Sequence, residues 1–305
     1  MESLNDLTMR RQPIAPRVLK LFQLTLAVAG LWGCSLLSPE QDIPTYLVVP
    51  SMDYAPGELQ GTSSQNITDL WVYSATDVVG VFPLPAVVPL LESDMEGGAV
   101  TLLAGIRENG LSDRRSPYPF YTTVDHLPNV GPGQRDTLVP QVQLVEEVRF
   151  IPVEDFETSN VLGAMAGGSG WDRVGDEAWV FEGNKSGQLV VSEDEPLVRI
   201  RTVEQEYDLQ GGLPAFLEMD YRCDQPFVVG LFGFRNGQET ALPGMVLSAT
   251  DDGTSAEWNK IYVDVSSLIS AHGPADHFEV YVECVLESGR SQGTIGLDNI
   301  RLLTY

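Results

Sequence analysis

Short segments in which apolar and polar residues alternate run through most of the chain. In residues 216–223 (FLEMDYRC) and 278–284 (FEVYVEC), every second side chain is apolar, and those between are mostly charged. A period of two indicates β-strands with one face on a core and the other in solvent. Eight such segments follow residue 154, and no stretch has the pattern of a long amphipathic helix.

The spacing of these segments predicts an all-β protein with two domains. Residues 66–153 contain β-rich segments, such as 67–73 and 99–106, separated by turn residues and prolines. They predict a small β-sandwich-like domain. Residues 154–305 hold more and longer strands, as a jelly-roll β-sandwich does. We therefore expect a small N-terminal β-domain followed by a jelly-roll β-sandwich.

The first part of the chain has the composition of an export signal. Basic residues precede an apolar stretch at residues 21–32. This stretch is too short to cross a bilayer, which takes about 20 residues. A basic start followed by a short apolar stretch is typical of a secretory signal peptide, and we expect residues 1–33 to form one. The acidic character of residues 1–8 favours Met9 as an alternative start to Met1.

Residues 31–34 (LWGC) resemble the lipobox of bacterial lipoproteins, in which the cysteine is acylated and becomes the first residue of the mature chain. The resemblance implies that Cys34 anchors the protein to a lipid bilayer. The alternative is an ordinary signal peptide with an incidental cysteine. Residues 34–65 predict a lipidated tether, with a short strand at 45–49 before a stretch rich in Pro, Gly and Ser at 56–65.

The charge of the chain excludes nucleic acid as a partner. Acidic residues outnumber basic ones 43 to 18, which gives a net charge of −25. Nucleic-acid binding needs Lys and Arg to displace counterions from phosphates. Anionic lipid headgroups would also repel this chain, so attachment would have to come from acyl chains. We expect an outer-membrane lipoprotein with an extracytoplasmic body, on the cell surface or on the periplasmic face.

Several segments resemble known domains. Residues 67–106, with Gly80 and Pro83, resemble the small PEGA-type β-domain. Residues 107–121 resemble a segment of uncharacterised lipoproteins of Bacteroidetes-type bacteria. Four motifs, in this order, resemble the galactose-binding-like jelly rolls, which include many carbohydrate-binding modules: EDFE at 154–157, FEGNKSG at 181–187, WNKIY at 258–262 and LDNIRL at 297–302.

This last resemblance implies a structural Ca²⁺ held by Glu157 and Asp298, with backbone carbonyls near Ser186. Calcium takes six to eight oxygen ligands, so carboxylates and carbonyls are the right type. The alternative is that Asp298 caps a turn and that Glu157 is solvated.

A sugar-binding face is the second candidate site. In residues 257–265, Ile261 and its alternate neighbours should face the core. The opposite side then carries Trp258, Lys260, Tyr262 and Asp264. Aromatic rings beside charged groups suit pyranoses, which have an apolar face and many hydroxyls. The alternative is that these aromatic residues are structural, because a bulge can turn such a Trp inward.

The remaining reactive residues give no catalytic array. Cys223 and Cys284 lie on apolar strand faces, and a disulfide and two buried free thiols are equally compatible with the sequence. The three histidines fall in expected loops or at a strand edge, outside any metal-binding array. We therefore expect no enzyme activity and no catalytic residues.

These features predict a non-catalytic outer-membrane lipoprotein that binds or scaffolds an envelope protein partner. An alternative is a carbohydrate-binding surface lipoprotein. A glycan hydrolase is a third reading, because many carboxylates are present and a pair could lie at the required spacing.

Overall fold

The computed structural model describes residues 42–305, apart from residues 76, 96–97, 159 and 251–256. Residues Pro44–Tyr305 form one compact unit. The expected signal peptide, the acylation site Cys34 and the first part of the expected tether lie outside the described residues. None of the helices in the described part of the chain combines the length and apolar character that a membrane span needs.

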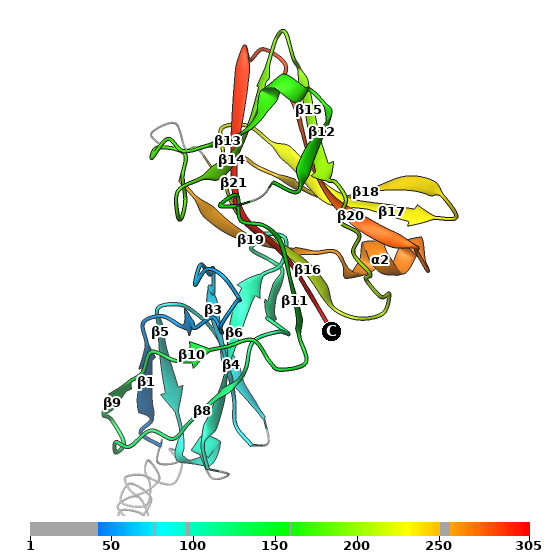
Figure 1. The fold of residues 1–305 in the computed structure, drawn as a ribbon. Helices are drawn as coiled ribbons and strands as arrows, with labels where there is room; N and C mark the ends of the chain where they lie inside the picture. Colours follow the sequence, from blue (N-terminus) through cyan, green and yellow to red (C-terminus); the bar gives the residue numbers. More distant parts are fainter. Residues whose placement is uncertain (1–41, 76, 96–97, 159, 251–256) are drawn as a thin grey trace, which may run out of the picture. The chain divides into compact units, whose positions relative to one another are not determined.

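The N-terminal part of this unit consists of three small β-sheets (Figure 1). Their strand orders are β5-β1-β9, β10-β2 and β4-β3-β6-β7, and β8 also pairs with β6. The strands are β1 (Thr45–Val49), β2 (Asp53–Tyr54), β3 (Asp69–Tyr73), β4 (Val78–Pro83), β5 (Ala86–Leu90), β6 (Val100–Arg107), β7 (Arg115–Pro117), β8 (Val124–His126), β9 (Arg135–Thr137) and β10 (Gln141–Val142).

The expectation of a tether over residues 34–65 is wrong from residue 44 onward. Strand β1 lies between β5 and β9 in its sheet. Leu47 and Val49 of β1 are fully buried, as are Met52 and, nearly, Tyr54 beyond it. The alternating apolar residues of this segment bury one face against the other strands, as in any half-buried strand. The segment is therefore part of the N-terminal core.

The C-terminal part is a two-sheet β-sandwich, which confirms the all-β, jelly-roll expectation. The first sheet contains β13 (Trp171–Val174), β14 (Ser186–Ser192), β21 (Gln292–Thr304), β16 (Ala215–Cys223) and β19 (Asn259–Asp264), with β11 (Arg149–Glu154) also paired to β21. The second contains β12 (Leu162–Ala166), β15 (Leu197–Thr202), β20 (His277–Val285), β17 (Phe227–Arg235) and β18 (Gln238–Leu247). A short helix, α2 (Ser266–His272), connects β19 to β20.

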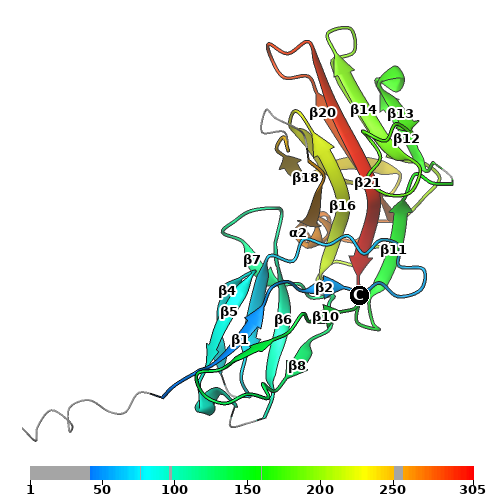
Figure 2. The same cartoon turned by 90° about the vertical axis from the view of Figure 1, so that its left-hand side faces the viewer.

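The inward faces follow the alternation in the sequence. Leu217, Met219 and Cys223 of β16 and the alternate residues of β20 belong to one core between the two sheets. Figure 2 shows β21 between β16 and β11. Since β11 starts at Arg149, the sandwich begins before residue 154, where the sequence placed its start.

The outward face of the first sheet does not lie in solvent as the alternation predicts. Glu218 and Asp220 of β16 are 0% and 1% exposed. Residues of the N-terminal part cover them, and Phe216, Tyr262 and Leu303 of the sandwich belong to the N-terminal core. The expectation that this face lies in solvent is wrong here, because it considered the sandwich without the N-terminal part that covers it.

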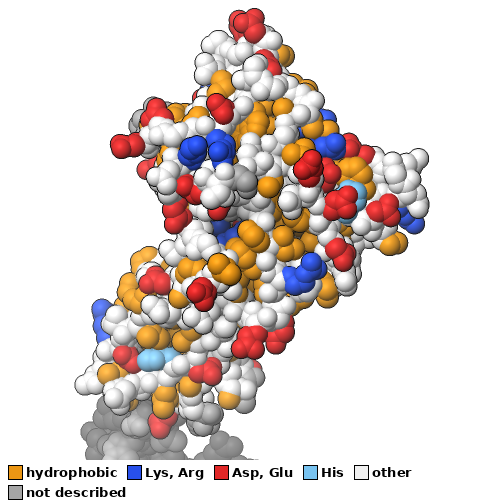
Figure 3. All heavy atoms as spheres, viewed as in Figure 1, with side chains coloured by type: hydrophobic (Ala, Val, Ile, Leu, Met, Phe, Trp, Pro, Cys, Tyr) orange, Lys and Arg blue, Asp and Glu red, His pale blue; other side chains and the backbone are white. Residues whose placement is uncertain are grey.

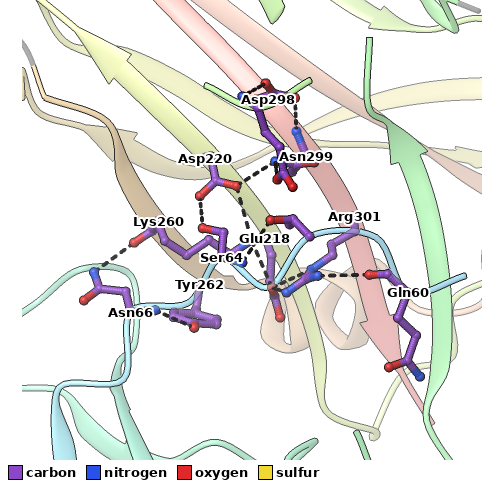
Figure 4. Close-up of polar contacts among 12 residues, drawn as sticks. Gln60, Ser64, Asn66, Glu218, Asp220, Lys260, Tyr262, Asp298, Asn299 and Arg301 are labelled. Carbon is purple, nitrogen blue, oxygen red and sulfur yellow. Dashed lines mark hydrogen bonds and ion pairs between the residues drawn. The ribbon is translucent and has the colours of Figure 1, made fainter. Parts of the chain in front are cut away.

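A connecting segment, residues 60–66, crosses this outward face strand by strand (Figure 4). Arg301 of β21 donates to the carbonyl of Gln60 (3.5 Å), and Ser64 donates to Asp220 of β16 (2.5 Å). The side chain of Asn66 donates to the carbonyl of Lys260 of β19 (3.0 Å). We call residues 60–66 the crossing segment.

A buried ion cluster lies beneath this segment. Glu218 Oε2 lies 2.7 Å from Arg301 Nε and 3.3 Å from Lys260 Nζ, and the Tyr118 hydroxyl donates to Glu218 Oε1. Burial raises the pKa of Glu218, but the Arg301 and Lys260 charges outweigh burial and hold that pKa below its usual value. Burial lowers the pKa of Arg301, and Glu218 more than reverses this. Glu218 and Arg301 are therefore a charged pair inside the protein.

We expect Arg301→Met to lower the free energy of unfolding by about 3–5 kcal/mol, because it leaves the Glu218 charge buried without its main partner. Urea unfolding followed by fluorescence measures this change. Adding Glu218→Leu to Arg301→Met should cost less than the sum of the two single changes. Arg135→Met, at an exposed position of β9, is the control and should have almost no effect. A loss below about 1 kcal/mol for Arg301→Met would contradict the role given to the cluster.

Candidate functional site

Three aromatic side chains gather on the outward face of the first sheet, next to the crossing segment. Trp258 directly precedes β19, whereas Trp179 and Phe181 belong to the loop between β13 and β14. The ring centroids of Phe181 and Trp258 are 5.3 Å apart. All three residues are partly exposed. We call them the aromatic cluster.

Gly296 of β21 makes room for this cluster. A Cβ atom at this position would lie 3.0 Å from the ring of Trp258 and 3.3 Å from the ring of Trp179. Both indoles therefore pack directly on the backbone of the sheet. A larger residue here would push at least one ring away from the surface.

Arg222 of β16 joins the cluster to the sheet. Its guanidinium carbon lies 4.4 Å from the centroid of the Trp179 ring, within the range of a cation–π contact. Its Nη1 donates to the carbonyl of Ala178, in the loop that carries Trp179. These two contacts hold the Trp179 ring against the outward face.

A polar pocket of about 400 Å³ lies beside the aromatic cluster. It is lined by Ser63, Ser64, Gln65, Asn66, Phe181, Asp220, Trp258, Asn259 and Lys260. Asn66 Nδ2 donates to Asn259 Oδ1 (3.2 Å) across one end of it. Both parts of the protein thus contribute: the crossing segment forms one wall and the sandwich forms the other (Figure 4).

A larger cavity, of about 510 Å³, lies beside α2. Its lining includes Pro117, Leu213 and Phe216, together with three serines of α2, and contains neither a tryptophan nor a basic residue. Its charged lining residues, Glu108 and Asp264, are both acidic, and Phe216 is its one aromatic lining residue, so it does not combine several aromatic rings with charged side chains of both signs as the polar pocket does.

The structure separates the four residues of the expected sugar-binding face. Trp258 is in the aromatic cluster, but Lys260 and Tyr262 are only 4% and 1% exposed. The expectation that they lie on an open face is wrong, because the N-terminal part covers them. Tyr262 accepts a hydrogen bond from the backbone of Asn66 (3.0 Å). Asp264 Oδ1 accepts hydrogen bonds from the backbone and hydroxyl of Ser266 at the start of α2.

Sequence reasoning missed Trp179, Phe181 and Arg222 as site residues. Phe181 is the first residue of FEGNKSG, one of the motifs on which the jelly-roll resemblance rests. This was the one signal in the sequence that could have identified it. Trp179 lies in a loop, where periodicity gives no orientation. Arg222 is on the polar side of β16, but nothing in the pattern says that a tryptophan from a distant loop covers it.

The two expected calcium ligands both contact the loop that leads into β14. Glu157 Oε1 accepts hydrogen bonds from the backbones of Asn184 (2.7 Å) and Lys185 (3.0 Å). The Asn184 hydrogen bonds lower the pKa of Glu157. Asp298 Oδ2 accepts from the backbone of Glu182 in this loop (3.4 Å) and from the hydroxyl of Ser186, the first residue of β14 (2.6 Å). Each carboxylate is thus engaged by protein donors.

Among the described residues, no group of three or more His, Cys, Asp or Glu side chains is placed to hold a metal ion. Calcium binding by Glu157 and Asp298 therefore stays a prediction from the sequence.

The structure decides the state of the two cysteines that the sequence left open. Cys223 and Cys284 are fully buried free thiols, so the disulfide alternative is wrong. The Cys284 sulfur accepts a hydrogen bond from Gln225 Nε2 (2.6 Å). Burial raises the pKa of Cys223 to about 12 and that of Cys284 to about 11. The thiols therefore stay protonated and pack as small apolar groups.

Among the comparisons with known proteins, only the one with solved structures found similar proteins. No protein-family model matches the chain, and no curated protein does. The family 30 carbohydrate-binding module of a cellulosomal cellulase of Clostridium thermocellum is similar over 50% of this chain and 96% of its own, with 12% identity and a TM-score of 0.38. TmCBM61 in complex with β-1,4-galactotriose is similar over 48% and 89%, with 12% identity and a TM-score of 0.30.

A CBM29-2 mutant complexed with mannohexaose is similar over 52% of this chain and 92% of its own, with 10% identity and a TM-score of 0.34. Identities and TM-scores this low assign no family and say nothing about what this chain binds. The evidence for function is the site itself.

Asp298 makes the stability of the sandwich depend on pH. It is 1% exposed, and burial raises its pKa to about 7 from an ordinary value near 3.8. A carboxyl whose pKa is raised in the folded state stabilises that state most below pH 3.8, and loses this contribution as the pH rises through 7. We expect Asp298→Asn to reduce the difference in unfolding free energy between pH 5 and pH 8 by about 2 kcal/mol.

Urea unfolding of the two proteins at both pH values, in EDTA, measures this difference. Asp176→Asn, at an exposed position, is the matched control and should change nothing. An equal pH dependence for wild type and Asp298→Asn would contradict the prediction. A wild-type stability that falls when calcium is removed would instead support the calcium site.

Proposed function

We propose that the protein is a non-catalytic glycan-binding protein and that the aromatic cluster with its polar pocket is the binding site. The observation that carries the proposal is the placement of Trp179, Phe181 and Trp258 on one surface, with both indoles packed over Gly296 and polar groups at the border. The solved structures to which the sandwich is similar include complexes with oligosaccharides, but the proposal rests on the site alone.

The chemistry of the site fits a sugar ring. A pyranose has apolar C–H faces, which pack on aromatic rings, and hydroxyls that need hydrogen-bonding partners. The pocket offers the side chains of Asn66 and Asn259 as both donors and acceptors, and the Ser63 hydroxyl from the crossing segment. In this arrangement the aromatic rings contact the apolar face of the sugar, and the polar side chains of the pocket form hydrogen bonds with its hydroxyls.

The charge of the molecule favours an uncharged glycan. On the face shown in Figure 3, acidic side chains occur in many places and basic ones in fewer, and the whole chain carries a net charge of −25. In the pocket, Lys260 already faces the carboxylates of Glu218 and Asp220. A polysaccharide of uronic acids would meet an unfavourable field, and the basic residue that lines the pocket, Lys260, is already paired.

Attachment to the outer membrane through Cys34 is a proposal from the sequence, and so is an envelope protein partner. An acyl anchor would hold the glycan site at a membrane surface. The sandwich would then act as a receptor for neutral glycans outside the cytoplasm.

We expect the purified protein to bind neutral oligosaccharides on a glycan array in preference to uronic acid polymers. Trp258→Ala should weaken binding of the best ligand about tenfold, since an aromatic contact contributes about 1 kcal/mol or more. Trp179→Ala should have a similar effect. Isothermal titration calorimetry with the best array ligand measures both changes.

Phe234→Ala is the matched control, because Phe234 is a partly exposed aromatic residue on the second sheet, where it stacks on His277. It should bind as the wild type does. If the double variant of Trp179 and Trp258 binds a glycan with unchanged affinity, the site is elsewhere. If the folded wild type binds no glycan of the array, glycan binding itself is contradicted.

A further inference from the structure

Lys260 is an unusual residue at its position. The sequence contains 3 lysines against 15 arginines, yet a lysine occupies a buried position of the outward face, with a side chain 2% exposed. Arginine is the usual residue for buried ion pairs, because its planar guanidinium makes several fixed hydrogen bonds. Lysine differs in that it can lose its proton and act as a nucleophile.

Lys260 lies directly opposite a carboxyl group with which it could react. Lys260 of β19 and Asp220 of β16 are register partners in the antiparallel pair. Lys260 Nζ is 3.9 Å from Asp220 Oδ2 and 3.3 Å from Glu218 Oε2 (Figure 4). The Asp220 side chain is 1% exposed. An amine and two carboxyl groups thus lie together, and each of their side chains is at most 2% exposed.

We propose that Lys260 and Asp220 condense into an intramolecular amide bond that ties β19 to β16. The amine nitrogen Nζ attacks Cγ of Asp220 and the Nζ–Cγ bond forms. The bond from Cγ to one carboxyl oxygen breaks, and this oxygen leaves as one water molecule that carries one proton from the amine and one from the carboxyl group. An ammonium–carboxylate ion pair contains the same atoms as a free amine beside a carboxylic acid, so the balance is the same from either state. The reaction therefore releases one water molecule and needs no oxidant, reductant or other co-reactant.

Burial favours the reactive forms of both partners. Burial raises the pKa of Asp220, which favours its uncharged acid. Burial, reinforced by the neighbouring Arg301 charge, lowers the pKa of Lys260, which favours its free amine. A neutral amine is the nucleophile, and an uncharged carboxyl is the better electrophile. The same groups in water would remain an ion pair.

Glu218 is placed to move the proton. It lies within 3.3 Å of Lys260 Nζ, and its pairing with Arg301 keeps it a carboxylate. It can therefore accept the proton that the amine loses on attack and return it to the departing oxygen. The same pairing makes Glu218 a poor electrophile, which favours Asp220 as the partner of Lys260.

Two donors are aimed at the oxygens of Asp220. The Ser64 hydroxyl donates to Oδ1 (2.5 Å), and Asn299 Nδ2 donates to Oδ2 (3.1 Å). Hydrogen-bond donors held at such positions stabilise the negative charge that develops on the oxygen as the amine attacks. Because Ser64 belongs to the crossing segment, this arrangement is complete only when the two parts of the protein are joined.

Mass spectrometry of the full chain tests the proposal. The intact protein, denatured and reduced, should be lighter than its sequence by the mass of one water molecule. After proteolysis, a branched peptide should join the segment around Asp220 to the segment around Lys260. An intact mass that equals the sequence mass, or a branched peptide through Glu218 in place of Asp220, would overturn the assignment.

Variants distinguish the proposed amide bond from an ion pair between Lys260 and Asp220. Lys260→Arg keeps the positive charge and removes the nucleophile, so the loss of water should disappear. Lys185→Arg, at the other lysine of the described chain, is the matched control and should retain it. Glu218→Gln should slow or abolish the loss in protein that still folds by circular dichroism. Loss of water that persists in Lys260→Arg would also overturn the proposal.

Discussion

The structure depends on a buried carboxylate, Glu218, at the junction of its two parts. A charge without solvent is costly unless fixed partners compensate for it. Arg301 supplies the opposite charge, Lys260 Nζ lies 3.3 Å from the same carboxylate oxygen, and Tyr118 of the N-terminal part donates to the other oxygen. Because one of the four groups comes from the other part, the sandwich alone would leave this face incomplete. The cluster therefore makes the two β-structures a single unit.

The same junction creates the candidate site. The crossing segment covers Lys260 and Tyr262, which would otherwise lie on the open face of a sheet, and it provides one wall of the polar pocket. At the border of the covered area, Trp179 and Trp258 remain partly exposed over Gly296. The proposed glycan site is thus the part of the outward face that the N-terminal part leaves open. The proposed amide bond lies in the part that it covers.

Much of the fold could be predicted from alternation. The residues of β16 and β20 that the period of two assigns to the core are indeed in the core. The prediction was wrong where strand-like and turn-like residues occur in the same segment. Residues 44–65 combine a short strand with turn-rich composition, and composition alone suggested a tether, although Leu47 and Met52 are completely buried. Of the site, Trp258 and the pocket residue Lys260 were anticipated, whereas the other aromatic residues lie on a loop without a period.

The sequence by itself determined the class of fold and the inward face of most strands, because alternation is a local property that each strand carries within itself. It also determined the acidic character of the molecule, which is a sum over residues. Only the tertiary structure decided which outward faces stay in solvent. That outcome depends on contacts between residues far apart in the chain, such as Tyr118 with Glu218 and Ser64 with Asp220. No local pattern encodes these contacts, so a face that reads as polar and open became the buried, charged centre of the molecule.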